Sequence, residues 1–324
     1  MILAGDIGGT KSLLALYPPG GDPRQPVHGR SLPSRNYSQL SDCLKDFLDA
    51  AKEKVTFACL GIPGPVVVGR SVTPNLPWDT VDAAELREAL GTEVVLLNDL
   101  EAKGYGIATL RPEELHCLSP GQPAAGNAAL IAPGTVLGEC ILFWDGQMHR
   151  PSASEGGHCS FSPRNEMEIG LLRYLLRKYH HVSFDRIVSG KGLVNIYNYL
   201  RDSGSAEPAS LHEEISTAAD PAAAISRAAL EGRSELCQKA LHLMVESFGV
   251  EAGNLALKAL ATAGVYLGGG IAPKILPKLA DGTFVAAFRD KARLAPLLEA
   301  VPIHVILNAQ AALYGAARFA LMHV

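Results

Sequence analysis

The first segment that could do chemistry lies close to the amino terminus. Asp6 directly follows an apolar run, and Gly8-Gly9-Thr10 offers backbone N–H groups and a hydroxyl that no large side chain obstructs. Such N–H groups bind anions, and a neighbouring carboxylate suits a hydrated Mg²⁺ ion. A plain β-hairpin turn explains the same residues equally well, so the segment alone leaves both interpretations open.

A second candidate is the pair Asn98-Asp99, which follows the apolar run Val94–Leu97. Ligands of open α/β sheets bind at the carboxyl ends of the strands. An aspartate there could accept a proton from a substrate hydroxyl while Asn98 orients the substrate. Equally, Asn98 could be the N-cap of a helix over residues 100–110.

Two glycine-rich segments in the second half complete the set. Glu155-Gly156-Gly157-His158 places a carboxylate and an imidazole where they could converge on one polar ligand, although a buried, hydrogen-bonded histidine explains the pattern too. A metal is disfavoured there, because Cys159 alone is a poor additional donor. A strand at Tyr266-Leu267 is expected to end in the three glycines 268–270, which let the backbone approach a flat ligand closely.

One glycine-rich segment has the spacing of a phosphate-binding loop but lacks the sequence context that such a loop needs. Residues 64–71 have the spacing of a phosphate-binding Walker loop, with Arg70 in place of the lysine. That loop needs a helix directly after it, whereas residues 72–77 contain two prolines and read as extended chain. We therefore reject a phosphate site at this position.

The elements that must position these residues alternate between apolar strands and amphipathic helices, which predicts an α/β fold. Strands are expected at 2–4, 13–17, 55–61, 94–97, 129–131, 140–144 and 304–307, and helices at 40–51, 83–90, 100–110, 166–179, 192–200 and 222–261. Residues 18–36 are expected to be loop. Residues 111–123 have the composition of a domain boundary, and a closing helix follows the last strand. Gly134-Thr135 echoes Gly9-Thr10, a hint of internal duplication.

Composition narrows the function classes. The 324 residues (34.3 kDa) suit two lobes, and 32 glycines exceed the average share of about 7%. A net charge of −4 without a basic stripe argues against nucleic acid. Six cysteines without CxxC spacing suggest reduced thiols in the cytoplasm, and no segment predicts a signal peptide or a membrane span.

In this order, the motifs resemble those of the bacterial glucokinases of the hexokinase–actin–chaperone ATPase superfamily, over nearly the whole chain. The matching segments are residues 5–10, 61–66, 73–78, 97–99, 133–135, 154–158, 188–190, 268–273 and 288–291. The resemblance implies a two-lobed ribonuclease-H-like fold with a ligand cleft between the lobes. The small domain would contain residues 1–110 and the closing helix 308–324, and the large domain residues 111–307.

The same resemblance implies ATP-dependent phosphorylation of glucose at its 6-hydroxyl, the first step of glycolysis, with Asp99 as the general base. It implies no nucleic-acid or membrane partner and allows a homodimer. The implied sugar-binding residues are Asn75, Asn98, Asp99, Glu155, His158 and Asp185. The implied ATP-binding residues are Asp6, Gly8, Gly9, Thr10, Lys11, Gly134, Thr135, Gly269 and Gly270, with Asp6 also near Mg²⁺.

Two departures from the family pattern carry expectations of their own. Ala132 and Val136 replace glycines of the second phosphate loop, and a β-branched Val136 would be strained if its φ were positive. ATP binding would then be weakened, which keeps a sugar- or nucleotide-binding protein with little turnover as an alternative. Asp185 stands where the family generally has glutamate, which keeps a kinase for another hexose as a further alternative.

Overall fold

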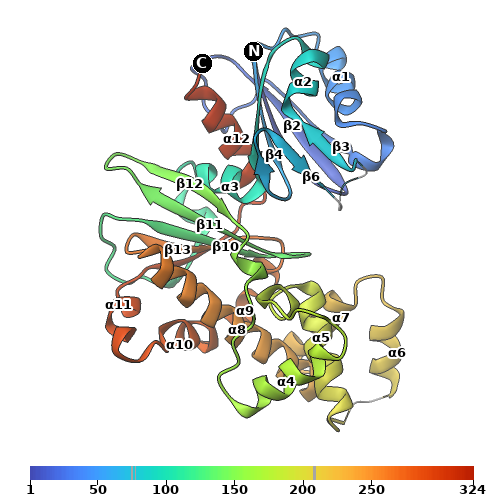
Figure 1. Ribbon diagram of the computed structural model, residues 1–324, viewed down its shortest axis with the longest axis vertical. Coiled ribbons are helices and arrows are strands. Elements are labelled where there is room, and N and C mark those ends of the chain that lie inside the picture. Colours follow the sequence, from blue (N-terminus) through green and yellow to red (C-terminus); the bar gives the residue numbers. More distant parts are fainter. Residues whose placement is uncertain (74–75, 77, 207–208) are drawn as a thin grey trace. The chain divides into compact units, whose positions relative to one another are not determined.

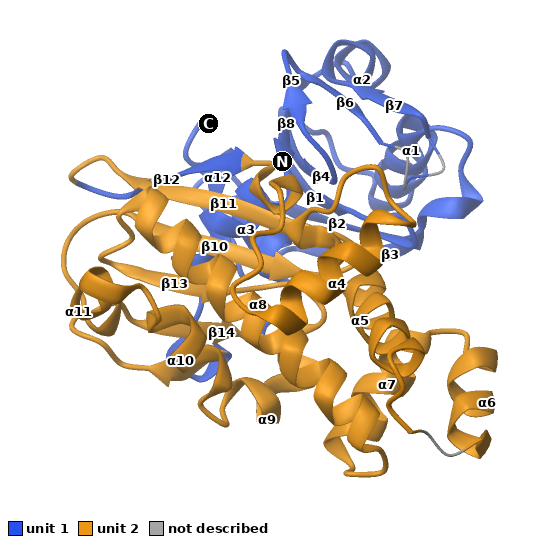
Figure 2. Ribbon diagram, turned by 60° about the horizontal axis from the view of Figure 1, so that its bottom comes forward, with its two compact units in different colours: residues 1–114, 147–153, 308–324 blue, residues 115–146, 154–307 orange. Residues whose placement is uncertain are grey.

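The computed structural model describes residues 1–73, 76, 78–206 and 209–324. The chain divides into two compact units, which Figure 2 colours separately. The first contains residues 1–114, 147–153 and 308–324, and the second contains residues 115–146 and 154–307. The boundary thus lies at residue 114 rather than at the expected 110. The assignment of residues 147–153 to the first unit was not expected, because no change of composition marks them.

A five-stranded sheet in the order β3-β2-β1-β4-β8 forms the centre of the first unit (Figure 1). β1 pairs antiparallel with β2 and parallel with β4, and β4 pairs parallel with β8. The strands are β1 (Ile2–Ile7), β2 (Lys11–Tyr17), β3 (His28–Pro33), β4 (Phe57–Ile62) and β8 (Glu93–Asn98). The helices are α1 (Leu40–Ala51), α2 (Ala83–Leu90), α3 (Asp99–Ile107) and α12 (Ala311–Leu321).

Both faces of this sheet are covered, because neighbouring side chains of a strand point to opposite sides. Leu3 of β1 packs in one buried cluster with Phe47 of α1 and Leu86 of α2. Ala4, the next residue of β1, packs in another cluster with Ala316 of α12. The continuous apolar strands of the sequence are explained by this double burial.

Strand β3 corrects the expectation of a loop over residues 18–36. It pairs antiparallel with β2 along six residues. Its sequence is mostly polar and only Leu32 is buried, because β3 is an edge strand of the sheet. An edge strand with no apolar face has no hydrophobic alternation to reveal it.

The rejected phosphate loop is a hairpin of a small sheet formed by β5 (Val66–Val67), β6 (Arg70–Val72) and β7 (Thr80–Asp82). Val68 and Gly69, both with positive φ, make the turn between β5 and β6. The described residues after Arg70 continue as strand and not as helix. The rejection is therefore confirmed.

The second unit repeats the strand plan of the first. β10 pairs antiparallel with β11 and parallel with β13, and β13 pairs parallel with β14, so that β11-β10-β13-β14 matches β2-β1-β4-β8. This agrees with the duplication suggested by the two Gly-Thr turns. The strands are β9 (Leu115–Ser119), β10 (Ala128–Pro133), β11 (Leu137–Trp144), β13 (Gly264–Leu267) and β14 (Ile303–Ile306), and β12 (His149–Ser154) follows β11 after the turn at Asp145-Gly146.

The helices of the second unit are α4 (Glu166–Leu176), α5 (Gly190–Asp202), α6 (Ala209–Thr217), α7 (Pro221–Leu230), α8 (Glu235–Ala259), α9 (Leu276–Leu279), α10 (Thr283–Arg289) and α11 (Ala295–Glu299). The single helix expected over 222–261 is two helices, α7 and α8. Gly232, with φ +70°, ends the first, and the Ser234 side chain accepts a hydrogen bond from Cys237 N–H to cap the second. Short 3₁₀ turns lie at 34–36, 112–114, 156–158, 184–186, 272–275 and 292–294.

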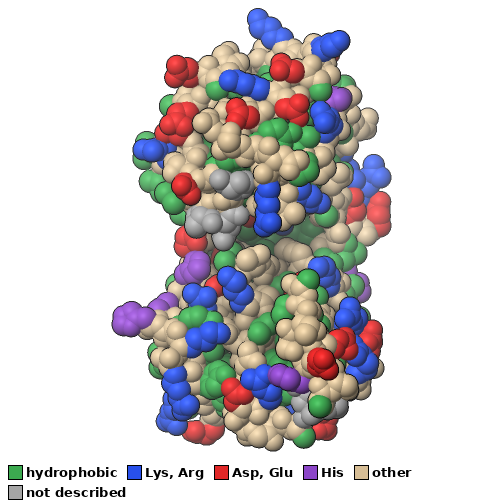
Figure 3. All heavy atoms as spheres, turned by 90° about the vertical axis from the view of Figure 1, so that its right-hand side faces the viewer, with side chains coloured by type: hydrophobic (Ala, Val, Ile, Leu, Met, Phe, Trp, Pro, Cys, Tyr) green, Lys and Arg blue, Asp and Glu red, His purple; other side chains and the backbone are tan. Residues whose placement is uncertain are grey.

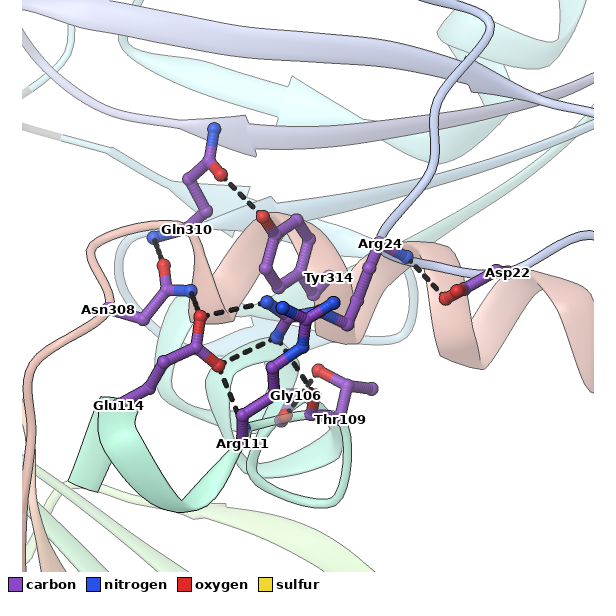
Figure 4. A network of polar contacts seen from close by, with 9 residues as sticks. All are labelled: Asp22, Arg24, Gly106, Thr109, Arg111, Glu114, Asn308, Gln310 and Tyr314. Atoms are coloured by element: carbon purple, nitrogen blue, oxygen red, sulfur yellow. Dashed lines mark hydrogen bonds and ion pairs between the residues drawn. The ribbon is translucent and has the colours of Figure 1, made fainter.

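A polar network in the first unit joins three segments that are far apart in the sequence (Figure 4). Arg24 donates to both carboxylate oxygens of Glu114, at 2.7 and 2.8 Å, and to Thr109 O at 2.9 Å. Asn308 Nδ2 donates to Glu114 Oε1 at 2.6 Å. Glu114 is the residue at which the chain first leaves this unit and Asn308 the one at which it returns for the last time, so one carboxylate joins these two crossing points.

Charged side chains of both signs are interspersed on each unit over the face in Figure 3. Among the described residues, none of the helices is long and apolar enough to cross a lipid bilayer. Within the described residues no cysteine forms a disulfide bond, and Cys117 and Cys159 are the exposed ones.

Candidate active site

Three parallel strands of the first unit end side by side and bring the candidate carboxylates to one edge. Asp6 of β1 is the partner of Gly61 in β4, and Ile62 is the partner of Asn98 at the end of β8. A Cβ added to Gly61 would lie 3.0 Å from Ala102 Cβ and 3.8 Å from Asp99 Cα. The absence of a side chain at Gly61 therefore lets the start of α3 approach the sheet closely.

Asn98 is the N-cap of α3, which confirms one of the two roles that the sequence suggested for it. Its Oδ1 accepts from the N–H groups of Leu100 and Glu101, at 2.9 and 3.3 Å, and the Glu101 side chain accepts from Asn98 N–H to complete a capping box. Its Nδ2 donates to Gly64 O at 3.0 Å. The amide thus fixes the direction of α3, and a contact with substrate stays a prediction.

Asp6 and Asp99 are both half-buried, and desolvation makes their carboxyls resist ionisation. Burial raises the pKa of Asp99 to about 6; Lys103, one turn further along α3, lowers that pKa in part, and the Asp6 charge raises it. Burial likewise raises the pKa of Asp6, against the charges of Lys103 and Lys11. A carboxylate with a pKa near 6 is a stronger base than an exposed aspartate and is still mostly ionised at pH 7.

Helix α12 holds α3 in place through two glycines. A Cβ added to Gly315 would lie 2.6 Å from Gly106 N, and one added to Gly106 would lie 2.8 Å from Ala311 C. The two backbones therefore touch without intervening side chains. α3 begins at Asp99, so this close packing constrains the helix that carries the Asp99 carboxyl, a dependence that the sequence did not indicate.

The turn between β1 and β2 is a tight hairpin, as the plain interpretation of Asp6–Thr10 held. Gly8 N–H donates to Lys11 O at 3.0 Å, and Ser34 Oγ donates to Gly8 O at 2.6 Å. Thr10 and Lys11 are exposed at its tip. The hairpin leaves Thr10 and Lys11 accessible, so an anion-binding role is compatible with it.

Mg²⁺ would have to be held mainly by oxygens from outside the protein. No group of three or more His, Cys, Asp or Glu side chains that could hold a metal occurs within residues 1–73, 76, 78–206 and 209–324. Mg²⁺ at phosphate sites is typically bound by one or two carboxylates, waters and substrate phosphates. Asp6, an oxygen donor beside the Gly8–Thr10 turn, fits that demand.

In the second unit, Glu155 and His158 lie on a 3₁₀ turn with their side chains toward solvent. His158 Nε2 is 3.9 Å from Glu155 Oε2, and each side chain is 53% exposed. His158 N–H donates to Glu155 O at 2.9 Å and closes the turn. The alternative of a buried histidine is therefore wrong, and both groups are accessible to a polar ligand.

Asp185 is buried and already bonded to the strand beneath that turn. Its Oδ1 accepts from Leu137 N–H of β11 at 2.8 Å, and its backbone carbonyl accepts from Ser189 Oγ at 2.7 Å. One oxygen of the shorter side chain is thus used within the protein. Asn75, the remaining predicted sugar ligand, lies outside the described residues.

The second phosphate turn is free of the strain that Val136 was expected to bring. Val136 is not among the residues with positive φ, and Gly134 N–H donates to Val136 O at 2.9 Å. Ala132 is buried within β10. Neither substitution gives a physical reason for weak ATP binding.

A cavity of about 520 Å³ adjoins this turn within the second unit. Position 269, next to this turn, requires glycine, because its φ is +79° and an added Cβ would lie 3.1 Å from Pro133 C. The N-termini of α5 and α7, capped by Ser189 and Asp220, also line the cavity. Further lining residues are Gly134, Thr135, Lys191, Val194, Met244, Gly270, Ile271 and Lys274.

This cavity combines the parts that a nucleotide needs. Helix N-termini and the cations Lys191 and Lys274 suit phosphate oxygens, and the apolar side chains suit a flat base. Sequence reasoning found its glycines but missed Lys191, Lys274 and the start of α7, because no local pattern joins them. Another cavity, of about 540 Å³ beside α8, contains none of the predicted site residues.

The sequence model of the glucokinase family matches residues 3–323. A glucokinase of Nostoc punctiforme is 40% identical, and one of Nostoc sp. is 41% identical, each alignment covering 98% of both chains. The crystal structure of a glucokinase from an Antarctic psychrotroph superposes with a TM-score of 0.83 at 27% identity, covering 98% of both chains. A Balamuthia mandrillaris glucokinase in complex with glucose has a TM-score of 0.81 at 22% identity, over 98% of this chain and 93% of that one.

Proposed function

Since this chain belongs to the glucokinase family, we propose that it phosphorylates glucose with ATP and that Asp99 takes the proton from the 6-hydroxyl. The place of the half-buried Asp99 at the start of α3, where the parallel strands of the sheet end, carries this proposal, and the raised pKa of its carboxyl agrees with it. Phosphoryl transfer depends on positioning and on charge neutralisation, and little covalent work falls to the protein. The base must therefore be fixed in direction, which the capping box and the α12 contact achieve.

Asp99 is suited to this step by its place as well as by its basicity. Its Oδ1 accepts from Leu100 N–H at 2.9 Å at the start of α3. The hydrogen bond and the positive end of the helix favour the ionised form, while burial opposes it. The balance leaves a carboxylate that can accept a proton at neutral pH without being permanently neutralised.

The second unit supplies the groups that would hold the sugar and the nucleotide. Glu155 and His158 are exposed and polar, so they can exchange hydrogen bonds with sugar hydroxyls, and Asp185 has its second oxygen for the same purpose. Gly134, Thr135, Gly269 and Gly270 adjoin or line the cavity that fits ATP.

The first hairpin would complete the phosphate site through Gly8, Gly9, Thr10 and Lys11. Asp6 would hold Mg²⁺ together with waters and the phosphate oxygens. Bound there, the ion neutralises charge on the phosphate chain. Lobe closure would exclude water, which otherwise competes as the phosphoryl acceptor.

The test is ATP-dependent phosphorylation of glucose by the wild type and by Asp99→Asn. A general base contributes a factor of about 10²–10⁴, so the variant should lose that much kcat while its glucose KM changes little. Asp49→Asn, an exposed carboxylate on α1, is the matched control and should keep wild-type activity. An Asp99→Asn rate within tenfold of wild type would contradict the assignment.

A sugar panel of glucose, mannose, fructose and N-acetylglucosamine tests the hexose. One carboxylate oxygen of Asp185 accepts a hydrogen bond from Leu137 N–H, so the other oxygen is the one available to bind a sugar hydroxyl. Glucose should have the highest kcat/KM. A higher value for another sugar would assign the enzyme to that hexose instead.

A further inference from the structure

A pair of buried carboxyl groups lies in the second unit outside the site described above. Glu139, in the middle of β11, is 2% exposed, and Glu251, in α8, is wholly buried. The Oε1 atom of each is buried without a hydrogen-bond partner among the described residues. Burial, and next the charge of Glu251, raise the pKa of Glu139 to about 8, and Lys258 lowers it in part.

Two neighbouring buried carboxylate oxygens that accept no hydrogen bond are costly, and one proton between the two groups would satisfy both. The groups around the pair fit this arrangement. Lys258 Nζ lies 3.5 Å from Glu251 Oε1, and Asn254 Nδ2 donates to Glu251 Oε2 at 2.8 Å. Lys291 Nζ donates to Val250 O, and the charge of Glu251 opposes the lowering of the Lys291 pKa by burial. With one shared proton, the pair and Lys258 together carry no net charge.

Glu139 lies directly beneath the turn that carries Glu155 and His158. A Cβ added to Gly156 would lie 2.9 Å from Glu139 Cδ and closer still to Oε2. Gly157 rests in the same way on Leu137, with an added Cβ 2.9 Å from Leu137 C. The turn therefore sits on two residues of one strand, and a movement of the Glu139 carboxyl meets Gly156 first.

We propose that Glu139 and Glu251 share one proton, and that this shared proton holds the turn of Glu155 and His158 in its sugar-binding position. Glu139 is a positioning residue, and the proposal rests on the proposed roles of Glu155 and His158. Loss of the proton places two buried carboxylates side by side. Their repulsion pushes Glu139 against Gly156 and displaces the turn.

The expected signature is a glucose KM that rises with pH while kcat changes little. With a midpoint near pH 8, the proton-sharing form accounts for about nine tenths of the protein at pH 7 and about one tenth at pH 9. If only that form binds sugar, glucose KM rises about tenfold over this interval. Glu139→Gln cannot ionise and its amide can donate to Glu251, so its KM should stay within about threefold of the pH 7 wild-type value throughout.

Two further variants sharpen the result. Glu251→Gln removes the other member of the pair and should also flatten the KM profile. Glu235→Gln changes an exposed carboxylate of the same helix and should keep the wild-type profile. A wild-type KM that does not rise, or an equal rise in Glu139→Gln, would overturn the proposal.

Thermal unfolding without sugar tests the pair independently of catalysis. The pKa of Glu139 in the folded protein is raised above its usual 4.5, which stabilises the fold at low pH, and this stabilisation is lost as pH rises through about 8. The wild-type Tm should therefore fall relative to that of Glu139→Gln between pH 6 and pH 9. A constant difference would refute proton sharing, whereas a fall in relative Tm without any glucose phosphorylation would refute only the proposed function.

Discussion

The contact between α3 and α12 predicts that Gly315→Ala damages both stability and catalysis. The added Cβ would lie 2.6 Å from Gly106 N and 2.8 Å from Ala102 C, whereas ordinary contacts begin at 3.4 Å. Ala102 O lies closer to the added Cβ than either of these atoms, so the helices must separate by more than about 0.8 Å, the difference between 3.4 and 2.6 Å. All three closest atoms are backbone, so no side-chain rotation can relieve the contact.

The expected cost follows from two opposing effects. Overpacking of this kind costs up to about 3 kcal/mol. Alanine in place of glycine returns about 1 kcal/mol of helix propensity, which leaves a loss of up to about 2 kcal/mol. Because α3 begins at Asp99, a shift of the helix also moves the proposed base, and a misplacement near 1 Å can cost up to about 10²-fold in rate.

Urea unfolding measures the first effect, and kcat for glucose phosphorylation, taken where both proteins are folded, measures the second. Gly29→Ala is the matched control in the same unit, because its added Cβ would meet nothing closer than 3.7 Å and its φ is not positive. The reciprocal Gly106→Ala should resemble Gly315→Ala. Wild-type stability and kcat in Gly315→Ala would refute the view that this contact positions the base.

Two further predictions concern acidic groups of the first unit. The pKa of about 6 for Asp99 predicts that kcat/KM falls as pH drops through 6, because the carboxylate then becomes protonated. Lys103 lowers this pKa, so Lys103→Met should move the fall to higher pH. A fall of kcat/KM near pH 4 would contradict the assignment of Asp99 as the base. Hydrogen bonds from Arg24 hold the pKa of Glu114 at about 2, so its stabilisation is present above pH 4.5 and lost as pH falls toward 2. In urea unfolding, Glu114→Gln should lower the free energy of unfolding by about 1.5–3 kcal/mol at pH 7 and by less at pH 3. The control Glu113→Gln should leave it unchanged. An equal loss at both pH values would exclude the ion pair as the cause.

The buried elements could be predicted because they carry periodic apolar residues. α1 and α2 begin and end where the spacing placed them, and β8 differs from its prediction by one residue at each end. β3 was not predicted because an edge strand needs no apolar alternation. α7 and α8 were predicted as one helix because the sequence is apolar on both sides of Gly232. The matching strand plans of the two units explain why the short Gly-Thr echo was informative despite its length.

The site was predicted only as far as local pattern reaches. Asp99 and the glycine turns stand at ends of strands, where α/β sheets gather ligands. Asn98 had two interpretations that only coordinates could separate, because capping depends on the N–H groups of Leu100 and Glu101. Glu139 and Glu251 are too far apart in sequence for any spacing rule, and their only trace is a carboxylate within an apolar strand and another within a buried helix.

The return of the chain to the first unit at Asn308 has a consequence for synthesis. Everything in the second unit leaves the ribosome before α12 does, so in the nascent chain α3 and the buried residues Cys59, Leu97 and Tyr105 lack the helix that covers them. The base-bearing helix is therefore locked last, after its own strands and a whole further unit have been made. With Asp99 as the proposed base, a chain assembled in this order has no rigidly held base until α12 has emerged.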